Sequence, residues 1–172
     1  MDPNRPVWAE RDRLILSKGH ASAIYYAALA HKGFFPFADL QEWGHIGAHL
    51  QGHPDRLKTP GVDMTTGMLG HGLSIGVGLA LAARISGSEY RTYVVLGDGE
   101  CDAGVVWEGA MAAGKYCLSN LLTIVDYNRV QLDGAVADVM PLEPFVDKWK
   151  AFNFAVLEID GHDVQLFLRI PT

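Results

Sequence analysis

The chain lacks several features that would assign it to a specialised class of protein. Its 172 residues contain only two cysteines, Cys101 and Cys117, which form no Cys-x-x-Cys pair. We therefore expect two reduced thiols rather than a disulfide framework, and neither is expected to act as a nucleophile. No apolar run approaches the roughly 18 residues that a membrane-spanning helix needs, and no low-complexity tract interrupts the chain.

Clustered positive charge is also missing. The net charge is -6, and lysine and arginine form no block, which argues against a nucleic-acid or anionic-membrane partner. The N-terminus lacks the charged and apolar regions of a signal peptide, so a cytoplasmic protein is expected. With 49% hydrophobic and 20% charged residues, the chain predicts a packed globule, one domain over residues 1–172.

The order of apolar segments predicts an α/β fold. Helices are expected over residues 21–32, 38–43, 70–85 and 105–118, and buried strands over residues 93–96, 121–125 and 155–159. Continuous apolar strands separated by helices indicate a doubly wound, mostly parallel sheet with helices on both faces. Before these elements, an extended arm leads into the short apolar run Leu14–Leu16.

The helix expected over residues 70–85 is rich in glycine and alanine. Gly72, Gly76 and Ala80 form a stripe of small residues, which in a chain without membrane spans indicates close helix packing. This apolar helix also predicts that the chain associates with itself or a partner through a mostly apolar surface.

Polar residues follow two of the expected strands. Gly97-Asp98-Gly99 comes directly after the first, and Asn128 follows the second, one βαβ unit later. The carboxyl ends of parallel strands meet at one edge of the sheet, so Asp98 and Asn128 are expected to lie together. A carboxylate, an amide oxygen and the backbone carbonyl of Val130 suit Mg²⁺, which completes its shell with phosphate and water. Glycines at 97 and 99 allow phosphate to approach the backbone.

Two other interpretations of this segment remain open. Gly97–Gly99 could be an ordinary turn in which Asp98 and Asn128 cap helices. A dinucleotide-binding loop fits less well, because Asp102 stands where its third glycine belongs. His45, His49 and His53 recur every four residues and could present a zinc face, but the glycines among them and Pro54 disfavour the helix that this would need.

Four segments resemble the transketolase family, specifically the N-terminal subunit of its two-component members. They are RDRLILSKGHA at 11–21, GHP at 52–54, TTGMLGHG at 65–72, and Gly97-Asp98-Gly99 with Asn128. They occur in the family's order across almost the whole chain. The resemblance implies the diphosphate-binding domain of a thiamine-diphosphate-binding fold.

The resemblance also implies a set of site residues. Asp98, Asn128 and the Val130 carbonyl would hold Mg²⁺, and Gly97, Gly99 and Asn128 would contact the diphosphate of thiamine diphosphate. Gly67 and Leu69 would line the pocket for the cofactor rings, with His71 as a further polar contact. His20 and His53 would be catalytic, relaying protons or binding sugar hydroxyls. The Asp160–Asp163 segment, expected at a strand end, receives no catalytic role.

By the same resemblance, the chain would transfer a two-carbon ketol unit from a ketose to an aldose. It would act only with a separate pyrimidine-binding subunit that supplies the cofactor-activating glutamate. The assembly would be a homodimer or heterotetramer, and its substrates sugars or sugar phosphates. Glu108 would lie at a subunit contact.

The chain departs from the family pattern in three places. Ala103 replaces a glutamate, and the chain starts just before Arg11 and stops soon after His162, so it would lack two segments that supply sugar-contacting histidines. We therefore expect a domain shortened at both ends. Two alternatives stay open: a non-catalytic cofactor-binding assembly subunit, and, with less support, an enzyme resembling deoxyxylulose-phosphate synthase.

Overall fold

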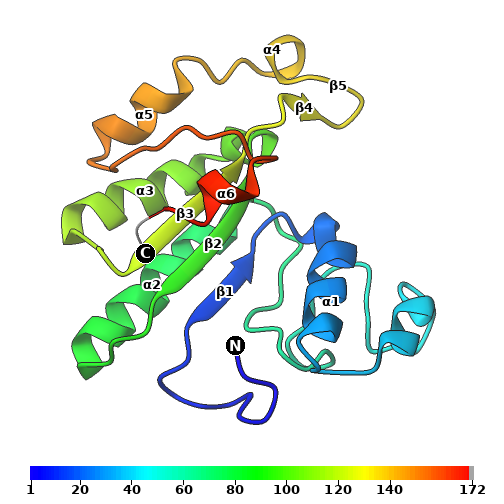
Figure 1. Ribbon diagram of the computed structural model, residues 1–172. Helices are drawn as coiled ribbons and strands as arrows, with labels where there is room; N and C mark the ends of the chain where they lie inside the picture. Colours follow the sequence, from blue (N-terminus) through cyan, green and yellow to red (C-terminus); the bar gives the residue numbers. More distant parts are fainter. Residues whose placement is uncertain (171–172) are drawn as a thin grey trace.

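A three-stranded parallel sheet forms the centre of the computed structural model, which describes residues 1–170 (Figure 1). Its strands are β1 (Arg13–Leu16), β2 (Thr92–Gly97) and β3 (Leu121–Asp126), with β2 in the middle. A small antiparallel hairpin, β4 (Val130–Gln131) and β5 (Gly134–Ala135), follows β3. The α-helices are α1 (Ser22–His31), α2 (His71–Ser86), α3 (Gly104–Tyr116), α4 (Val136–Val139), α5 (Phe145–Ala151) and α6 (Val164–Phe167). Short 3₁₀ helices are η1 (Gly19–Ala21), η2 (Phe37–Glu42) and η3 (Gly99–Asp102).

Helices cover both faces of the sheet, as the sequence predicts. Side chains of a strand alternate between faces, so Ile15, Val94 and Leu96 join one core cluster with α2 and α3. Leu16, and with it Val95, joins a second cluster with α1 on the opposite face. The expected α/β class with a parallel sheet is therefore confirmed. Within residues 1–170, no helix has both the length and the hydropathy that crossing a membrane requires.

The small residues of α2 let this helix lie directly on the sheet. A Cβ atom at Gly76 would come within 2.5 Å of Val94 Cγ2, and one at Gly72 would collide with the Ser17 side chain, just after β1. Because both positions face the sheet, the stripe marks close packing inside the domain, as expected.

The expected helices at 21–32, 70–85 and 105–118 and the strands at 93–96 and 121–125 are confirmed. The strand expected at 155–159 is wrong. Its backbone pairs with no strand of residues 1–170, and only side chains such as Val156 pack against the core. The apolar run thus signals burial rather than pairing. The following Asp160–Asp163 segment consequently ends no strand, and Asp163 instead caps α6 by accepting the Leu166 N–H.

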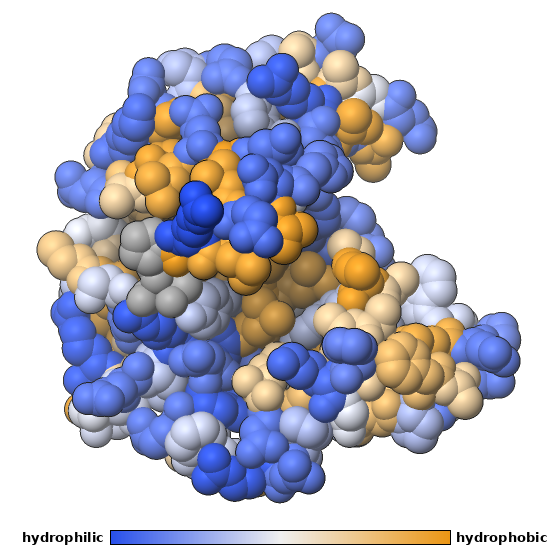
Figure 2. All heavy atoms as spheres, viewed as in Figure 1, coloured by the Kyte–Doolittle hydropathy of each residue, from blue (hydrophilic) through white to orange (hydrophobic). Residues whose placement is uncertain are grey.

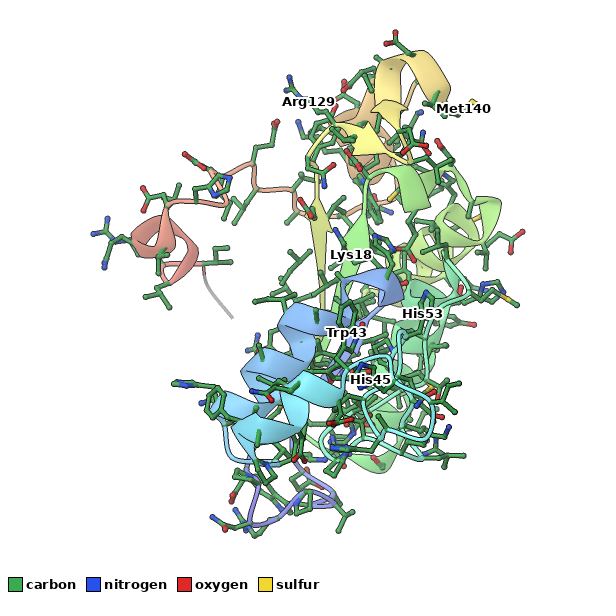
Figure 3. The ribbon with its side chains drawn as sticks, turned by 90° about the vertical axis from the view of Figure 1, so that its right-hand side faces the viewer. Lys18, Trp43, His45, His53, Arg129 and Met140 are labelled. Carbon is green, nitrogen blue, oxygen red and sulfur yellow. The ribbon has the colours of Figure 1, made fainter. Side chains whose placement is uncertain are left out.

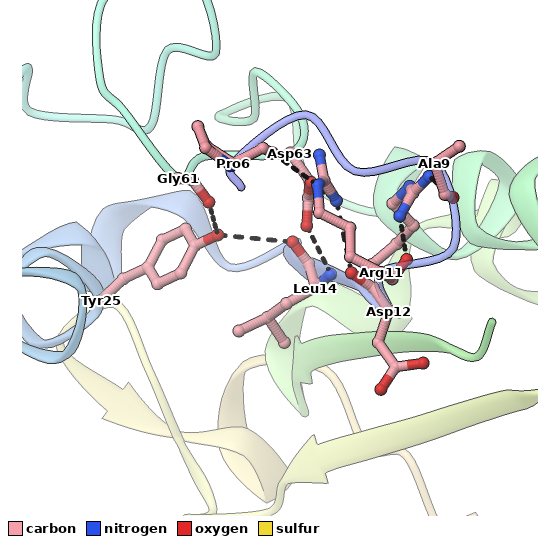
Figure 4. Close-up of polar contacts among 9 residues, drawn as sticks. Pro6, Ala9, Arg11, Asp12, Leu14, Tyr25, Gly61 and Asp63 are labelled. Atoms are coloured by element: carbon pink, nitrogen blue, oxygen red, sulfur yellow. Dashed lines mark hydrogen bonds and ion pairs between the residues drawn. The ribbon is translucent and has the colours of Figure 1, made fainter. Parts of the chain in front are cut away.

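A buried carboxylate secures the outer edge of β1 (Figure 4). Asp63, whose side chain is 3% exposed, pairs with Arg11 and accepts the Leu14 N–H at 2.8 Å. The Tyr25 hydroxyl donates weakly to the Gly61 carbonyl at 3.4 Å, and burial raises the pKa of this phenol. The N-terminal arm and the loop that carries Asp63 therefore satisfy an edge strand that would otherwise expose its backbone.

The surface around α6 is less completely covered. Figure 2 shows apolar side chains gathered around α6 and the segment leading to it, beside a hollow on the side of α1. Leu157, Val164 and Leu168 are each more than 60% exposed there. An apolar surface of this kind is typical of a protein contact.

Candidate functional site

The loops after β2 and β3 meet at the carboxyl edge of the sheet. Asp98 is 2% exposed, and its Oδ1 accepts the Gly99 N–H at 2.8 Å. Its Oδ2 accepts the Arg129 N–H at 2.6 Å, and its own N–H donates to the Asp126 carbonyl at 3.2 Å. One buried carboxylate thus joins the loops after β2 and β3, which the sequence predicts to lie together.

Asn128 lies beside this carboxylate but faces its own loop. Its Oδ1 accepts the Val130 N–H at 2.9 Å, and its Nδ2 donates to Asp126 Oδ2 at 3.4 Å. The capping interpretation is therefore right for Asp98, which caps η3, and wrong for Asn128, which closes a turn before β4. Neither arrangement prevents metal binding, because the side-chain oxygens of Asp98 and Asn128 that accept these hydrogen bonds each keep a second lone pair.

The glycines differ in how strictly the structure requires them. A Cβ at Gly99 would come within 2.5 Å of Gln131 Cβ, whereas one at Gly97 would meet nothing closer than 4.0 Å. Gly99 therefore permits the hairpin to pack over the turn. Gly97 contributes its N–H, which donates to Glu100 Oε2 at 3.1 Å.

Glu100 is the main feature that sequence reasoning missed. This carboxylate is 4% exposed and accepts hydrogen bonds from the Ser17 hydroxyl, from the Gly70 N–H at 2.6 Å and from the Gly97 N–H. It joins the ends of β1 and β2 to the start of α2. In the sequence, only its position directly after the Gly-Asp-Gly turn could have suggested such a role.

The neighbouring Cys101 agrees with the expectation of an inert thiol. It is fully buried, and its Sγ lies 3.3 Å from the Gly97 carbonyl oxygen. Burial raises the pKa of this thiol well above its usual range. The side chain therefore stays protonated, which disfavours a role as nucleophile or metal ligand.

Of the two histidines expected to be catalytic, His53 contacts the loop that carries Gly67, and His20 follows Gly19, which lies beside the same loop. The His53 ring packs on Gly67, with Cδ2 3.2 Å from the position a Cβ would occupy. The turn that carries His20 approaches the same loop, because a Cβ at Gly19 would lie 2.9 Å from the Gly67 nitrogen. Both histidines are exposed. Gly67 has a φ of 138°, a conformation that favours glycine.

A hollow of about 240 Å³ adjoins this loop. It is lined by Thr65, Thr66, Met68, His71, Gly72 and Ile75. The ring of His71 lies with Nδ1 3.2 Å from the Leu69 carbonyl oxygen, and both residues are exposed. The structure therefore places His71 in the lining of this hollow and next to the Leu69 carbonyl.

The remaining histidines do not converge on a zinc site. His45 pairs with Glu42 at 3.1 Å and His49 with Asp39 at 3.0 Å, while His53 faces Gly67. Among residues 1–170, no three His, Cys, Asp or Glu side chains are placed to hold a metal ion together. A metal at this edge would have to rely on amide, carbonyl and ligand oxygens in addition to Asp98.

The site fits Mg²⁺ and a diphosphate in its chemistry. Asp98, Asn128 and the Val130 carbonyl offer only hard oxygen donors, and few protein ligands are typical of Mg²⁺. A Cβ at Gly97 would meet nothing closer than 4.0 Å, so the missing side chain leaves space beside this backbone, which a phosphate could approach. Lys18 adds a cation at the same edge, with Nζ 2.7 Å from Asp126 Oδ2 (Figure 3).

Together these features define a parallel α/β domain with a polar, glycine-lined site at the carboxyl edge of its sheet. The chain belongs to the transketolase family, because the family model described as "Transketolase, thiamine diphosphate binding domain" matches residues 1–169.

Curated relatives and solved structures agree with this assignment. The chain is 48% identical over 163 residues to the 6-deoxy-6-sulfo-D-fructose transketolase subunit SqwG of Clostridium sp. (strain MSTE9). It is 43% identical over 167 residues to an apulose-4-phosphate transketolase subunit of Phocaeicola vulgatus. These alignments cover 95% and 97% of the chain but only 59% of each relative. A crystal structure of a Pichia stipitis transketolase variant superimposes with a TM-score of 0.91 at 33% identity, covering 97% of this chain and 26% of that one.

Proposed function

We propose that this chain binds thiamine diphosphate through Mg²⁺ and forms the diphosphate-binding part of a two-component transketolase. Asp98, Asn128 and the Val130 carbonyl would hold the metal, and Gly97, Gly99 and Asn128 would contact the diphosphate. The observation that carries this proposal is the Asp98 carboxylate, which is buried and hydrogen-bonded to both loops at the sheet edge.

The neighbouring residues support the rest of the cofactor site. Gly67 and Leu69 would line the ring pocket with His71, beside the hollow of about 240 Å³. Thiamine diphosphate, when bound, supplies the chemistry that breaks a carbon–carbon bond of a ketose and retains two carbons for transfer to an aldose. His53, whose ring packs on Gly67, and His20, which follows the neighbouring Gly19, are both exposed and would donate hydrogen bonds to sugar hydroxyls or move protons.

A second polypeptide would complete the site. The similarity to proteins named as transketolase subunits supports a pyrimidine-binding partner, and the exposed apolar residues around α6 support an association surface. The substrates would be sugars or sugar phosphates, the class named in those relatives. Residues 1–172 would act as a single cofactor-binding domain within a homodimer or heterotetramer.

Calorimetry tests the cofactor part directly. Thiamine diphosphate would be titrated into the chain with and without Mg²⁺, and into Asp98→Ala. We expect metal-dependent binding that weakens by roughly 100-fold or more in the variant, because a directly coordinating carboxylate is lost. Asp133→Asn, an exposed carboxylate change in the nearby hairpin, is the matched control and should leave binding unchanged.

Adding a pyrimidine-binding transketolase partner tests the activity. Ketol transfer that requires both chains and Asp98 supports the split enzyme. Cofactor binding without transfer in the presence of the partner would instead indicate a non-catalytic role in assembly. Metal-independent binding, or equal binding by Asp98→Ala, would overturn the proposed site.

A further inference from the structure

Asp126 carries one carboxylate oxygen that is shared between two loops. Its Oδ2 lies 2.7 Å from Lys18 Nζ, at the end of β1, and 3.4 Å from Asn128 Nδ2. The Lys18 side chain is only 12% exposed, whereas that of Asp126 is 47% exposed. A mostly buried lysine side chain therefore pairs with a half-exposed carboxylate, and that carboxylate also accepts from the amide nitrogen of Asn128.

We propose that Lys18 and Asp126 are positioning residues that orient the Asn128 side chain for metal binding. This inference rests on the proposed function. An asparagine amide has a donor end and an acceptor end, and only the oxygen can bind Mg²⁺. When Asp126 accepts from Nδ2, the amide nitrogen is occupied, and Oδ1, which accepts the Val130 N–H, keeps a lone pair that would be available to a metal.

The rest of the fold makes this orientation specific. Backbone pairing fixes the position of Asp126, because it lies opposite Gly97 in the register of β2 and β3. The carbonyl of Asp126 also accepts the Asp98 N–H at 3.2 Å. Lys18 then fixes the carboxylate itself, from a third strand end. Asn128 is otherwise exposed, and among residues 1–170 its amide nitrogen has no other hydrogen-bond acceptor. Partners of this outer kind commonly determine how a ligand presents itself to a metal.

A direct contact of Lys18 with the diphosphate is the competing explanation, and the two make different predictions. A positioning role changes the Mg²⁺ concentration needed for half-maximal cofactor binding but not the cofactor affinity at saturating Mg²⁺. A direct contact lowers the cofactor affinity even at saturating Mg²⁺, because a cation facing phosphate is lost. The two quantities can be measured separately by calorimetry or by quenching of tryptophan fluorescence.

The experiment compares Asp126→Ala, Asp126→Asn, Lys18→Met and the double variant Lys18→Met with Asp126→Ala. We expect the half-saturating Mg²⁺ concentration to rise roughly 10- to 100-fold in Asp126→Ala, the range seen for outer-shell partners. Asp126→Asn keeps an oxygen that can accept from Asn128 and should recover most of the loss. The double variant should be no worse than Asp126→Ala alone, since both residues act on one amide.

Lys115→Met, on the surface of α3, and Asp133→Asn are the matched controls and should behave as the unaltered chain. Unchanged Mg²⁺ dependence in Asp126→Ala, or a loss in Asp126→Asn as large as in Asp126→Ala, would overturn the positioning role while leaving the cofactor site intact. A loss of cofactor affinity at saturating Mg²⁺ in Lys18→Met would assign Lys18 to the diphosphate instead. If the unaltered chain binds no cofactor with Mg²⁺, the proposed function fails and this inference fails with it.

Discussion

The two loops that build the candidate site differ in how firmly the rest of the chain holds them. In the loop after β2, Asp98, Glu100 and Cys101 are each at most 4% exposed. In the loop after β3, Asn128 and Val130 are exposed, and among residues 1–170 the Asn128 side chain hydrogen-bonds only to neighbours two residues away. The first loop is therefore fixed by folding. The second has few buried contacts, so its geometry can adjust when a ligand arrives.

Removing Glu100 should break the first loop and have the largest effect on stability. Glu100→Ala leaves the Ser17 hydroxyl and the Gly70 and Gly97 N–H groups without their buried acceptor. We expect a loss of roughly 3 kcal/mol or more in the free energy of unfolding, measured with denaturant. Glu100→Gln keeps one oxygen acceptor and should lose about half as much. Equal losses in both variants would show that the charge, rather than the hydrogen bonds, matters.

A methyl group at Gly99 should break the contact between the two loops. Gly99→Ala places a Cβ 2.5 Å from Gln131 Cβ, so the hairpin must shift. We expect a destabilisation of about 1–3 kcal/mol, as for other overpacked sites, and weaker cofactor binding. Gly104→Ala is the control, because its Cβ would meet nothing within 4 Å and alanine favours the first turn of α3. If the Gly99→Ala protein is as stable as Gly104→Ala, the hairpin can move away from the added methyl group without a measurable loss in the free energy of unfolding.

Asn128→Ala should sharpen the contrast, because it affects binding without affecting the fold. The side chain is exposed, so we expect the free energy of unfolding to change by about 0.5 kcal/mol or less. Metal-dependent cofactor binding should weaken by roughly tenfold or more as one proposed Mg²⁺ ligand is lost. Thermal unfolding and calorimetry on the same sample would separate the two effects. A large loss of stability would mean that this loop is as firmly held as the first.

The same contrast explains how far the sequence predicted the molecule. The strands at 93–96 and 121–125 were predictable because continuous apolar runs pack between helices, and Asp98 and Asn128 followed from their positions at the strand ends. The β4–β5 hairpin was not predicted, because strands of two residues carry no periodic signal. Leu14–Leu16 was too short to distinguish from the arm before it.

Features that depend on distant partners were harder to predict. The apolar segment 155–159 resembles a strand, yet pairing needs a neighbouring strand edge that the local sequence does not specify. In the sequence Glu100 cannot be distinguished from an ordinary exposed loop carboxylate, because its partners Ser17 and Gly70 are brought to it only by the fold. The pairing of Asp126 with Lys18 could not be predicted either, because it depends on the ends of β1 and β3 lying together in the fold.

Tyr127→Phe should have the smallest effect and tests what anchors the second loop. The Tyr127 hydroxyl donates to Glu143, and this bond lowers the pKa of the Glu143 carboxyl below its ordinary value of 4.5. A carboxyl group whose pKa is lower in the folded than in the unfolded state stabilises the fold at pH values above its unfolded pKa. This stabilisation is lost as the pH falls through the folded-state pKa. The phenylalanine variant should therefore raise the Glu143 pKa toward 4.5 and leave stability at neutral pH nearly unchanged, since both groups lie near the surface. Carboxyl-detected NMR titration measures the shift. An unaltered Glu143 pKa would mean that the Phe145 N–H, which also donates to this carboxylate at 2.8 Å, is sufficient to hold it, and that the loop after β3 is freer than its contacts suggest.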